Sequence, residues 1–185
     1  MIDLLRAPSM KINQPAAHLD HLLRQTRFHH AQLSAMADVK ANMLLTMSSV
    51  VITLATPHLF KPTFKWPLLI LITFCLVTAG LAAYAVMPKL PLSPRAQPHP
   101  DVRNPKFNLL FFGDFTRLDY EEFKAAMEEI MNDPSRTYEA QVREVYTLGV
   151  FLVTRKYRFL RLAYLSFIAG LFTSFVTMLF SGALR

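Results

Sequence analysis

The stretch Pro67-LLILITFCLVTAGLAAYAV-Met87 decides the fold of this 185-residue chain. It contains no charged side chain, and Pro88 follows it directly. A helix needs about 20 apolar residues to cross the hydrocarbon core of a bilayer. The stretch has that length, so we predict a membrane-spanning helix over residues 67–87.

Two further apolar blocks lie on either side of this stretch. Residues 41–60 carry no formal charge, and only Pro57 and His58 interrupt them near their end. Residues 159–181 form the third block, in which Arg161 is close enough to one edge to reach the lipid headgroups. Three buried helices of a soluble protein would need a large polar shell, which this chain lacks. We therefore predict an all-α membrane protein with three transmembrane helices.

Lysine and arginine residues are distributed unevenly around these blocks. Five precede the first block and twelve lie between Lys89 and Arg161, whereas the other side has only Lys61, Lys65 and Arg185. Because cytoplasmic loops retain basic residues, we expect residues 1–40 and 88–158 in the cytoplasm and a short external loop at 61–66. The net charge of +7 has the same explanation, and no duplex DNA partner is expected.

Long helical stalks are predicted on the cytoplasmic side of the first and third blocks. The second stalk begins after Asp133-Pro134, with Ser135 as the predicted N-cap. The first begins near Ala16, and its apolar residues recur at spacings typical of a helix seam. They include Leu19, Leu22, Leu33, Met36, Met43, Met47, Val50 and Leu54. Isolated helices are marginal in water, so the stalks need partners, and we expect a homo-oligomeric bundle.

The segment between the second and third blocks divides into three parts. Residues 88–105 are rich in proline and are predicted to be extended. An apolar patch, Phe107–Asp114, follows and ends in a turn. Asp119-Tyr-Glu-Glu122 then predicts a capping box that opens a short helix to about Asn132.

A polar stripe runs along the first block. It consists of Asn42, Thr46, Ser49, Thr53 and Thr56. Two interpretations remain open for it, hydrogen bonds between helices and the wall of a pore. Asp38 and Lys40, at its cytoplasmic end, are candidates for a gate or a structural ion pair. A weaker stripe in the third block favours close helix packing, and it consists of Ser166, Gly170, Thr173 and Thr177.

Motifs for catalysis or metal binding are missing from the sequence. It has no glycine-rich phosphate loop, paired-cysteine motif or metalloprotease helix motif. The histidines 18, 21, 29 and 30 lack the further ligands that would complete a metal site. We therefore predict no enzyme activity, no cofactor and no metal ion.

A basic cluster crosses the cytoplasmic edge of the third block. It contains Arg155, Lys156, Arg158 and Arg161, which can anchor the helix among lipid headgroups. The alternative is a phosphorylated ligand, because arginine donates paired hydrogen bonds to phosphate. The candidate ligand residues are Arg24, Arg27, Arg155, Lys156 and Arg158.

Three sequence motifs resemble those of the membrane effectors of Pycsar antiphage defence. The first is His30-Ala-x5-Ala37-Asp-x-Lys-Ala41, and the second is Leu110-Phe-Phe-Gly-Asp114 followed by Leu118-Asp-x-Glu-Glu-Phe123. The third is Tyr146-x-Leu-Gly149 with Arg155-Lys-Tyr-Arg-x-Leu-Arg-x-Ala-Tyr164. The resemblance covers about Leu19 to Ser181, in the same order of blocks.

This resemblance implies a multi-pass effector of the bacterial inner membrane, with a cytoplasmic N-terminus and a periplasmic C-terminus. Its partner would be a cyclase or nucleotidyltransferase that makes a nucleotide second messenger on infection. The messenger is a cyclic pyrimidine mononucleotide in Pycsar and an oligonucleotide in related systems such as Hailong. We expect an oligomeric ion channel or pore, lined by the polar stripe and gated by the messenger in the cytoplasmic bundle. The alternative is a non-conducting scaffold that recruits or regulates a soluble partner enzyme.

Overall fold

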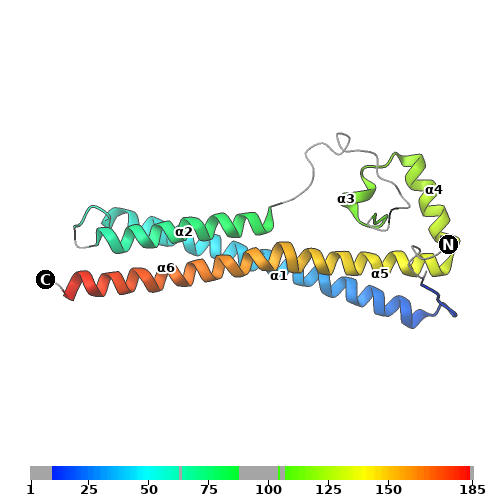
Figure 1. The fold of residues 1–185 in the computed structure, drawn as a ribbon, viewed down its shortest axis with the longest axis horizontal. Helices are drawn as coiled ribbons and strands as arrows, with labels where there is room; N and C mark the ends of the chain where they lie inside the picture. The colour runs from blue at the N-terminus through cyan, green and yellow to red at the C-terminus, as the bar shows by residue number, and fades with distance from the viewer. Residues whose placement is uncertain (1–9, 63, 88–103, 105–106, 184–185) are drawn as a thin grey trace, which may run out of the picture. The chain divides into compact units, whose positions relative to one another are not determined.

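The structure, a computed structural model, describes residues 10–62, 64–87, 104 and 107–183 (Figure 1). The predicted proline-rich linker lies outside these residues, apart from Asn104. The described chain is built of helices and contains no strand. It divides into two compact units. We call residues 1–30 and 89–150 the stalk unit, and residues 31–88 and 151–185 the membrane unit.

Three helical stretches are long and apolar enough to cross a membrane, namely Ala17–His58, Lys65–Val86 and Pro134–Ser181. Helix α1 (Ala17–Ala55) and helix α2 (Lys65–Val86) contain the first two spans. Helix α5 (Pro134–Phe151) continues through a π-helix (Leu152–Tyr157) into α6 (Arg158–Ala183), which contains the third. The predicted all-α fold with three spanning helices is confirmed. The structure contains one chain, so the homo-oligomeric bundle remains a prediction.

The first span ends earlier than predicted. Helix α1 stops at Ala55, and a single 3₁₀ turn (Thr56–His58) follows it. Pro57 explains the difference, because proline has no N–H to donate to the preceding turn and disfavours helical geometry in the residue before it. The chain therefore leaves the α-helix before the predicted end at residue 60.

The core of the membrane unit lies where α1, α2 and α6 meet. Small side chains dominate it, and they let the helix backbones approach closely. The buried core residues are Ala37, Ala41, Leu44, Cys75, Ala82, Leu160, Ala163 and Phe167.

Helices α2 and α6 pack closely against each other (Figure 1). A Cβ atom added to Gly170 would lie 2.4 Å from the Cβ atom of Phe74. Buried Ser174 donates a hydrogen bond to the carbonyl of Pro67 at 2.9 Å, and Ser166 donates one to the carbonyl of Phe74 at 3.4 Å. The predicted close packing therefore holds for Ser166 and Gly170.

Thr173 and Thr177, the other two members of that predicted stripe, make no hydrogen bond to α2 among the described residues. Their hydroxyls donate instead to carbonyls of their own helix, at 2.7 Å to Ala169 and 2.8 Å to Thr173. The seam runs on from Gly170 to Ser174, because residues four apart lie on the same face of a helix.

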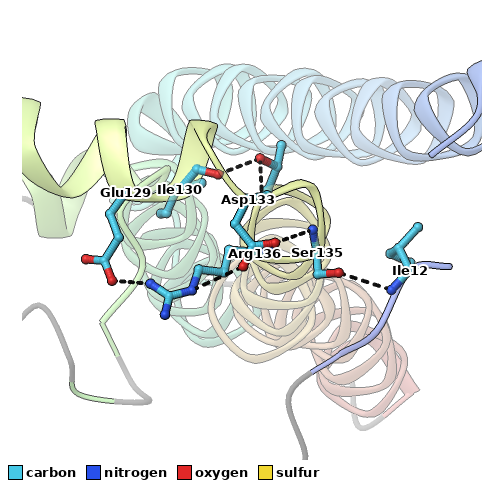
Figure 2. Close-up of polar contacts among 7 residues, drawn as sticks. Ile12, Glu129, Ile130, Asp133, Ser135 and Arg136 are labelled. Atoms are coloured by element: carbon cyan, nitrogen blue, oxygen red, sulfur yellow. Dashed lines mark hydrogen bonds and ion pairs between the residues drawn. The ribbon is translucent and has the colours of Figure 1, made fainter. Parts of the chain in front are cut away.

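The stalk unit contains the start of α1, helix α3 (Phe112–Phe115), helix α4 (Tyr120–Met131) and helix α5. The predicted capping box of Asp119 and Glu122 opens α4, which ends at Met131 with Asn132 as its C-cap, in agreement with the prediction. At the corner between α4 and α5, Arg136 pairs with Glu129, and the Thr137 hydroxyl donates to the carbonyl of Ile130 (Figure 2). These contacts fix the turn between the two helices.

The N-cap of α5 is Asp133, and the prediction of Ser135 was wrong. The Asp133 carboxylate accepts the backbone N–H groups of Ser135 at 2.9 Å and Arg136 at 3.4 Å (Figure 2). Pro134 suits the first helical position, where a missing N–H costs nothing, so the cap must come before it. The Ser135 hydroxyl instead accepts the backbone N–H of Ile12 at 3.3 Å.

Gly170 offers a test of the packing between α2 and α6. We expect Gly170→Ala to lower the free energy of unfolding by about 1–3 kcal/mol, because the new methyl group meets a Cβ atom that cannot move aside. Unfolding in bicelles measures this difference. Gly80→Ala is the matched control, since a Cβ atom there meets nothing within 4 Å. A Gly170→Ala protein as stable as the Gly80→Ala protein would contradict this packing.

Candidate functional site: a stalk cleft and a polar helix face

A cleft of about 510 Å³ lies in the stalk unit, along α1 and α5. This volume is within the range of small-molecule sites. The cleft combines an apolar wall with polar and charged groups. Its lining residues are Asp20, Leu23, Arg24, Arg27, Leu110, Gln141, Glu144 and Val145.

Two polar contacts between α1 and α5 hold this cleft. Tyr138 donates a hydrogen bond to the carboxylate of Asp20 at 2.6 Å, and this bond raises the pKa of the Tyr138 phenol. Arg27 pairs with Glu144 at 3.1 Å. The stalk segments of the chain thus partner each other, as the instability of lone helices in water requires.

The two side chains of the Arg27–Glu144 pair differ strongly in solvent exposure. The Glu144 side chain is 10% exposed, whereas that of Arg27 is 62% exposed. Burial raises the pKa of the Glu144 carboxyl, and the positive charge of Arg27 partly opposes this rise. Arg27 can therefore bind an external anion while its partner Glu144 remains buried.

The Leu110-Phe-Phe-Gly-Asp114 motif builds one wall of the cleft. The Asp114 carboxylate accepts the backbone N–H of Asn108 at 3.0 Å, which closes the turn. A Cβ atom on Gly113 would lie 2.6 Å from the ring of Phe111, so glycine allows the ring to fold back. Arg143 of α5 donates to the carbonyl of Phe107 at 3.3 Å, and Leu110 lines the cleft.

The polar stripe on α1 is exposed in the membrane unit. The buried face of α1 instead carries Ala37, Ala41, Leu44, Ser48 and Ala55. Four stripe hydroxyls donate to the backbone carbonyl four residues earlier at 2.7–3.0 Å, and they belong to Thr46, Ser49, Thr53 and Thr56. The side chain of Asn42 is exposed and has no hydrogen-bond partner among the described residues.

Asp38 forms an ion pair, but its partner is Lys156 and not Lys40. The Lys156 ammonium lies 2.7 and 2.8 Å from the two carboxylate oxygens of Asp38. It also donates to the Ser34 hydroxyl at 2.8 Å. Lys40 is exposed. Of the two residues proposed for a structural ion pair, only Asp38 forms one within the part of the chain that the structure describes.

The five predicted ligand residues are divided between the two units. Arg24 and Arg27 line the cleft of the stalk unit, whereas Arg155, Lys156 and Arg158 belong to the membrane unit. Arg155 and Arg158 are exposed, and Lys156 is engaged by Asp38. No single described site contains all five.

Sequence reasoning missed several of the residues that hold these sites, namely Asp20, Ser34, Tyr138, Gln141 and Glu144. One signal was present for the cleft. Asp20 and Arg27 are seven residues apart and therefore share a face of α1, as a pair of partners for an adjacent helix would. Ser34 gave no comparable signal, because serine is common on helices.

Residues of the first and third motifs contact each other in each unit. In the stalk unit, the His30 ring lies 3.3 Å from the position that a Cβ atom of Gly149 would occupy. In the membrane unit, Asp38 binds Lys156. The motifs are therefore structural partners.

A family model described as the Pycsar effector protein domain matches residues 21–182. The chain belongs to this Pycsar effector family. Pycsar effectors of this kind are membrane proteins of antiphage defence that act with a cyclic nucleotide signal from a partner cyclase. The match includes the three apolar blocks, the Asp38–Lys156 pair and every lining residue of the cleft except Asp20, and it confirms the resemblance seen in the motifs. Comparison with curated proteins and with solved structures finds no match.

The buried carboxyl of Glu144 predicts a pH dependence of stability. Because burial raises its pKa, the folded Pycsar effector binds this proton more tightly than the unfolded chain does. The contribution of Glu144 is then fully present below its ordinary pKa of 4.5 and is lost as the pH rises through the raised value. We expect Glu144→Gln to remove this loss of stability at higher pH. Melting temperatures measured from about pH 4 to pH 8 test it.

Glu139→Gln is the matched control, because Glu139 pairs with Arg143 on the surface of the same helix. The melting temperature of this variant should depend on pH in the same way as that of the wild type. A Glu144→Gln protein whose profile matches that of the wild type would contradict the role given to burial.

Proposed function

We propose that this chain is the subunit of a homo-oligomeric ion channel, which opens when a nucleotide second messenger binds its cytoplasmic stalks. The observation that carries the proposal is the polar face of α1. It points away from the core that α1 forms with α2 and α6. In this proposal the chain transmits a signal and needs no catalytic step.

The chemistry of that face favours a protein or water environment over lipid. Hydroxyls bonded to their own helix tolerate lipid, whereas the carboxamide of Asn42, at the cytoplasmic end of the span, has no hydrogen-bond partner among the described residues and favours protein or water beside it. Asp38 lies one turn earlier on α1, where it pairs with Lys156. Since α2 and α6 occupy the opposite side of α1, further copies of the chain are the natural partners. Three spans of one subunit are too few to enclose a pore, which also requires several copies.

The stalk cleft is the candidate messenger site. Arg24 and Arg27 supply guanidinium groups for phosphate, and Gln141 supplies an amide for a base edge. Leu23, Leu110 and Val145 offer an apolar surface. When a phosphate binds Arg27, it replaces Glu144 as the partner of that guanidinium. Arg155 and Arg158 remain candidates for a second contact or for lipid headgroups.

Gating follows from the two states of such an assembly. The messenger can open the channel only by as much as it binds the open state more tightly than the closed one. The positive-inside rule favours a cytoplasmic position for the stalks, where a cyclase would release its product. The channel would lie in the bacterial inner membrane, with the C-terminus on the periplasmic side.

One observation favours the rival function, a non-conducting scaffold that recruits or regulates a soluble enzyme. The hydroxyls of Thr46, Ser49 and Thr53 are already satisfied by their own helix, so most of the stripe could lie against lipid or a neighbouring helix. The two functions differ in whether these side chains meet water.

Replacement of the stripe separates the channel from the scaffold. We expect Thr46→Leu, Ser49→Leu and Thr53→Leu together to abolish messenger-dependent ion flux from liposomes, because leucine removes the polar wall. The panel of messengers contains cyclic mononucleotides and short oligonucleotides. Thr173→Leu with Thr177→Leu is the matched control, since these hydroxyls on α6 are likewise bonded to their own helix.

The control protein should conduct like the wild type. Flux that survives in the triple variant would contradict a pore lined by the stripe. Wild-type protein that is folded and oligomeric yet silent with every messenger would contradict the channel. The second result would favour the scaffold.

A further inference from the structure

The helix that joins stalk to membrane is interrupted by a π-helix. Residues Leu152–Tyr157 form this segment between α5 and α6. In a π-helix the backbone bonds run from i to i+5, and such segments are rare and are found mostly at functional sites. The boundary between the two compact units falls at its start, between Val150 and Phe151.

Two side chains of the π-helix reach the same short stretch of α1. Lys156 binds both carboxylate oxygens of Asp38 and the hydroxyl of Ser34. Tyr157, the next residue, donates its hydroxyl to the carbonyl of Leu33 at 3.0 Å. Residues 33–38 of α1 therefore receive both contacts.

Lys156 is turned inward while its basic neighbours point outward. Its side chain is only 13% exposed, whereas Arg155 and Arg158 are exposed. A cation withdrawn from water at the edge of a membrane is costly unless it is paired, and Asp38 provides the opposite charge. The three donors of an ammonium group all find acceptors in Asp38 and Ser34.

The inward position of Lys156 depends on the π register. A residue in a π-helix advances through a smaller angle around the axis than a residue in an α-helix. If residues 152–157 changed to α-helical bonds, Lys156 would rotate away from Asp38, and α6 would turn about its axis.

We propose that residues 152–157 are a register switch, latched by Lys156 on Asp38 and Ser34, which holds the channel in its closed state. Asp38 lies one turn before Asn42, the first residue of the polar stripe, so release of the latch alters α1 directly before the stripe begins. The gating consequence rests on the proposed channel function. The latch itself is a property of a single chain and is testable without conduction.

Single substitutions break the latch, and a charge swap restores it. We expect Lys156→Met and Asp38→Asn each to raise messenger-free ion flux about tenfold or more, because each leaves an unpaired group in the closed state. Hydrogen exchange of the amides of residues 152–157 should also become faster. The double variant Asp38→Lys with Lys156→Asp should return both quantities toward the wild type.

Arg161→Met is the matched control. It removes an exposed cation about one turn further along α6 without touching the latch. It should leave both flux and exchange unchanged.

The two readouts separate the latch from the channel. Faster exchange in Lys156→Met and Asp38→Asn, with no flux from any protein even when messengers are present, would support the latch and contradict the channel. Exchange in both single variants equal to that of the wild type would overturn the latch, whatever the flux. A charge-swapped protein that exchanges as fast as the single variants would overturn it as well.

Discussion

Hydrocarbon offers no hydrogen-bond partner, and the structure of this Pycsar effector depends on that constraint. Each span is a helix that satisfies its own backbone, and most hydroxyls within the spans bond to carbonyls of their own or a neighbouring helix. Ser174 on the carbonyl of Pro67 is an example between helices, and Thr46 on the carbonyl of Asn42 is one within a helix. The Asn42 carboxamide has no such partner among the described residues, so it marks a part of the chain that needs protein or water beside it.

Much of the fold could be predicted from sequence, because long uncharged blocks leave few alternatives. The spans, the capping box of α4 and the close packing at Gly170 all follow from residue type and spacing. The errors have local causes. Pro57 ended the first span early, and Pro134 moved the cap of α5 from Ser135 to Asp133, since the rules for proline competed with a plausible serine cap. Thr173 and Thr177 were grouped with Ser166 and Gly170, whereas Ser174 makes the further hydrogen bond to α2.

The candidate sites were harder to predict, because a helical pattern shows which residues share a face but not which helix lies opposite. Arg24 and Arg27 were selected for their charge, yet the cleft also depends on Glu144 and Tyr138 of α5. Lys156 was grouped with Arg155 and Arg158 as one basic cluster. In the π-helix, Lys156 contacts Asp38, whereas Arg155 and Arg158 are exposed. The local composition of residues 152–157 does not predict a π-helix.

The central claim is that the polar face of α1 meets water in the assembled protein. The most direct measurement is the reactivity of Ser49→Cys with a charged, membrane-impermeant thiol reagent, in a Cys75→Ala background with messenger present. Phe172→Cys, at an exposed apolar position of α6, is the lipid-facing comparison. The channel predicts that the cysteine at position 49 reacts and that the cysteine at position 172 does not. Equal lack of reaction at the two positions would contradict a water-filled pore along α1.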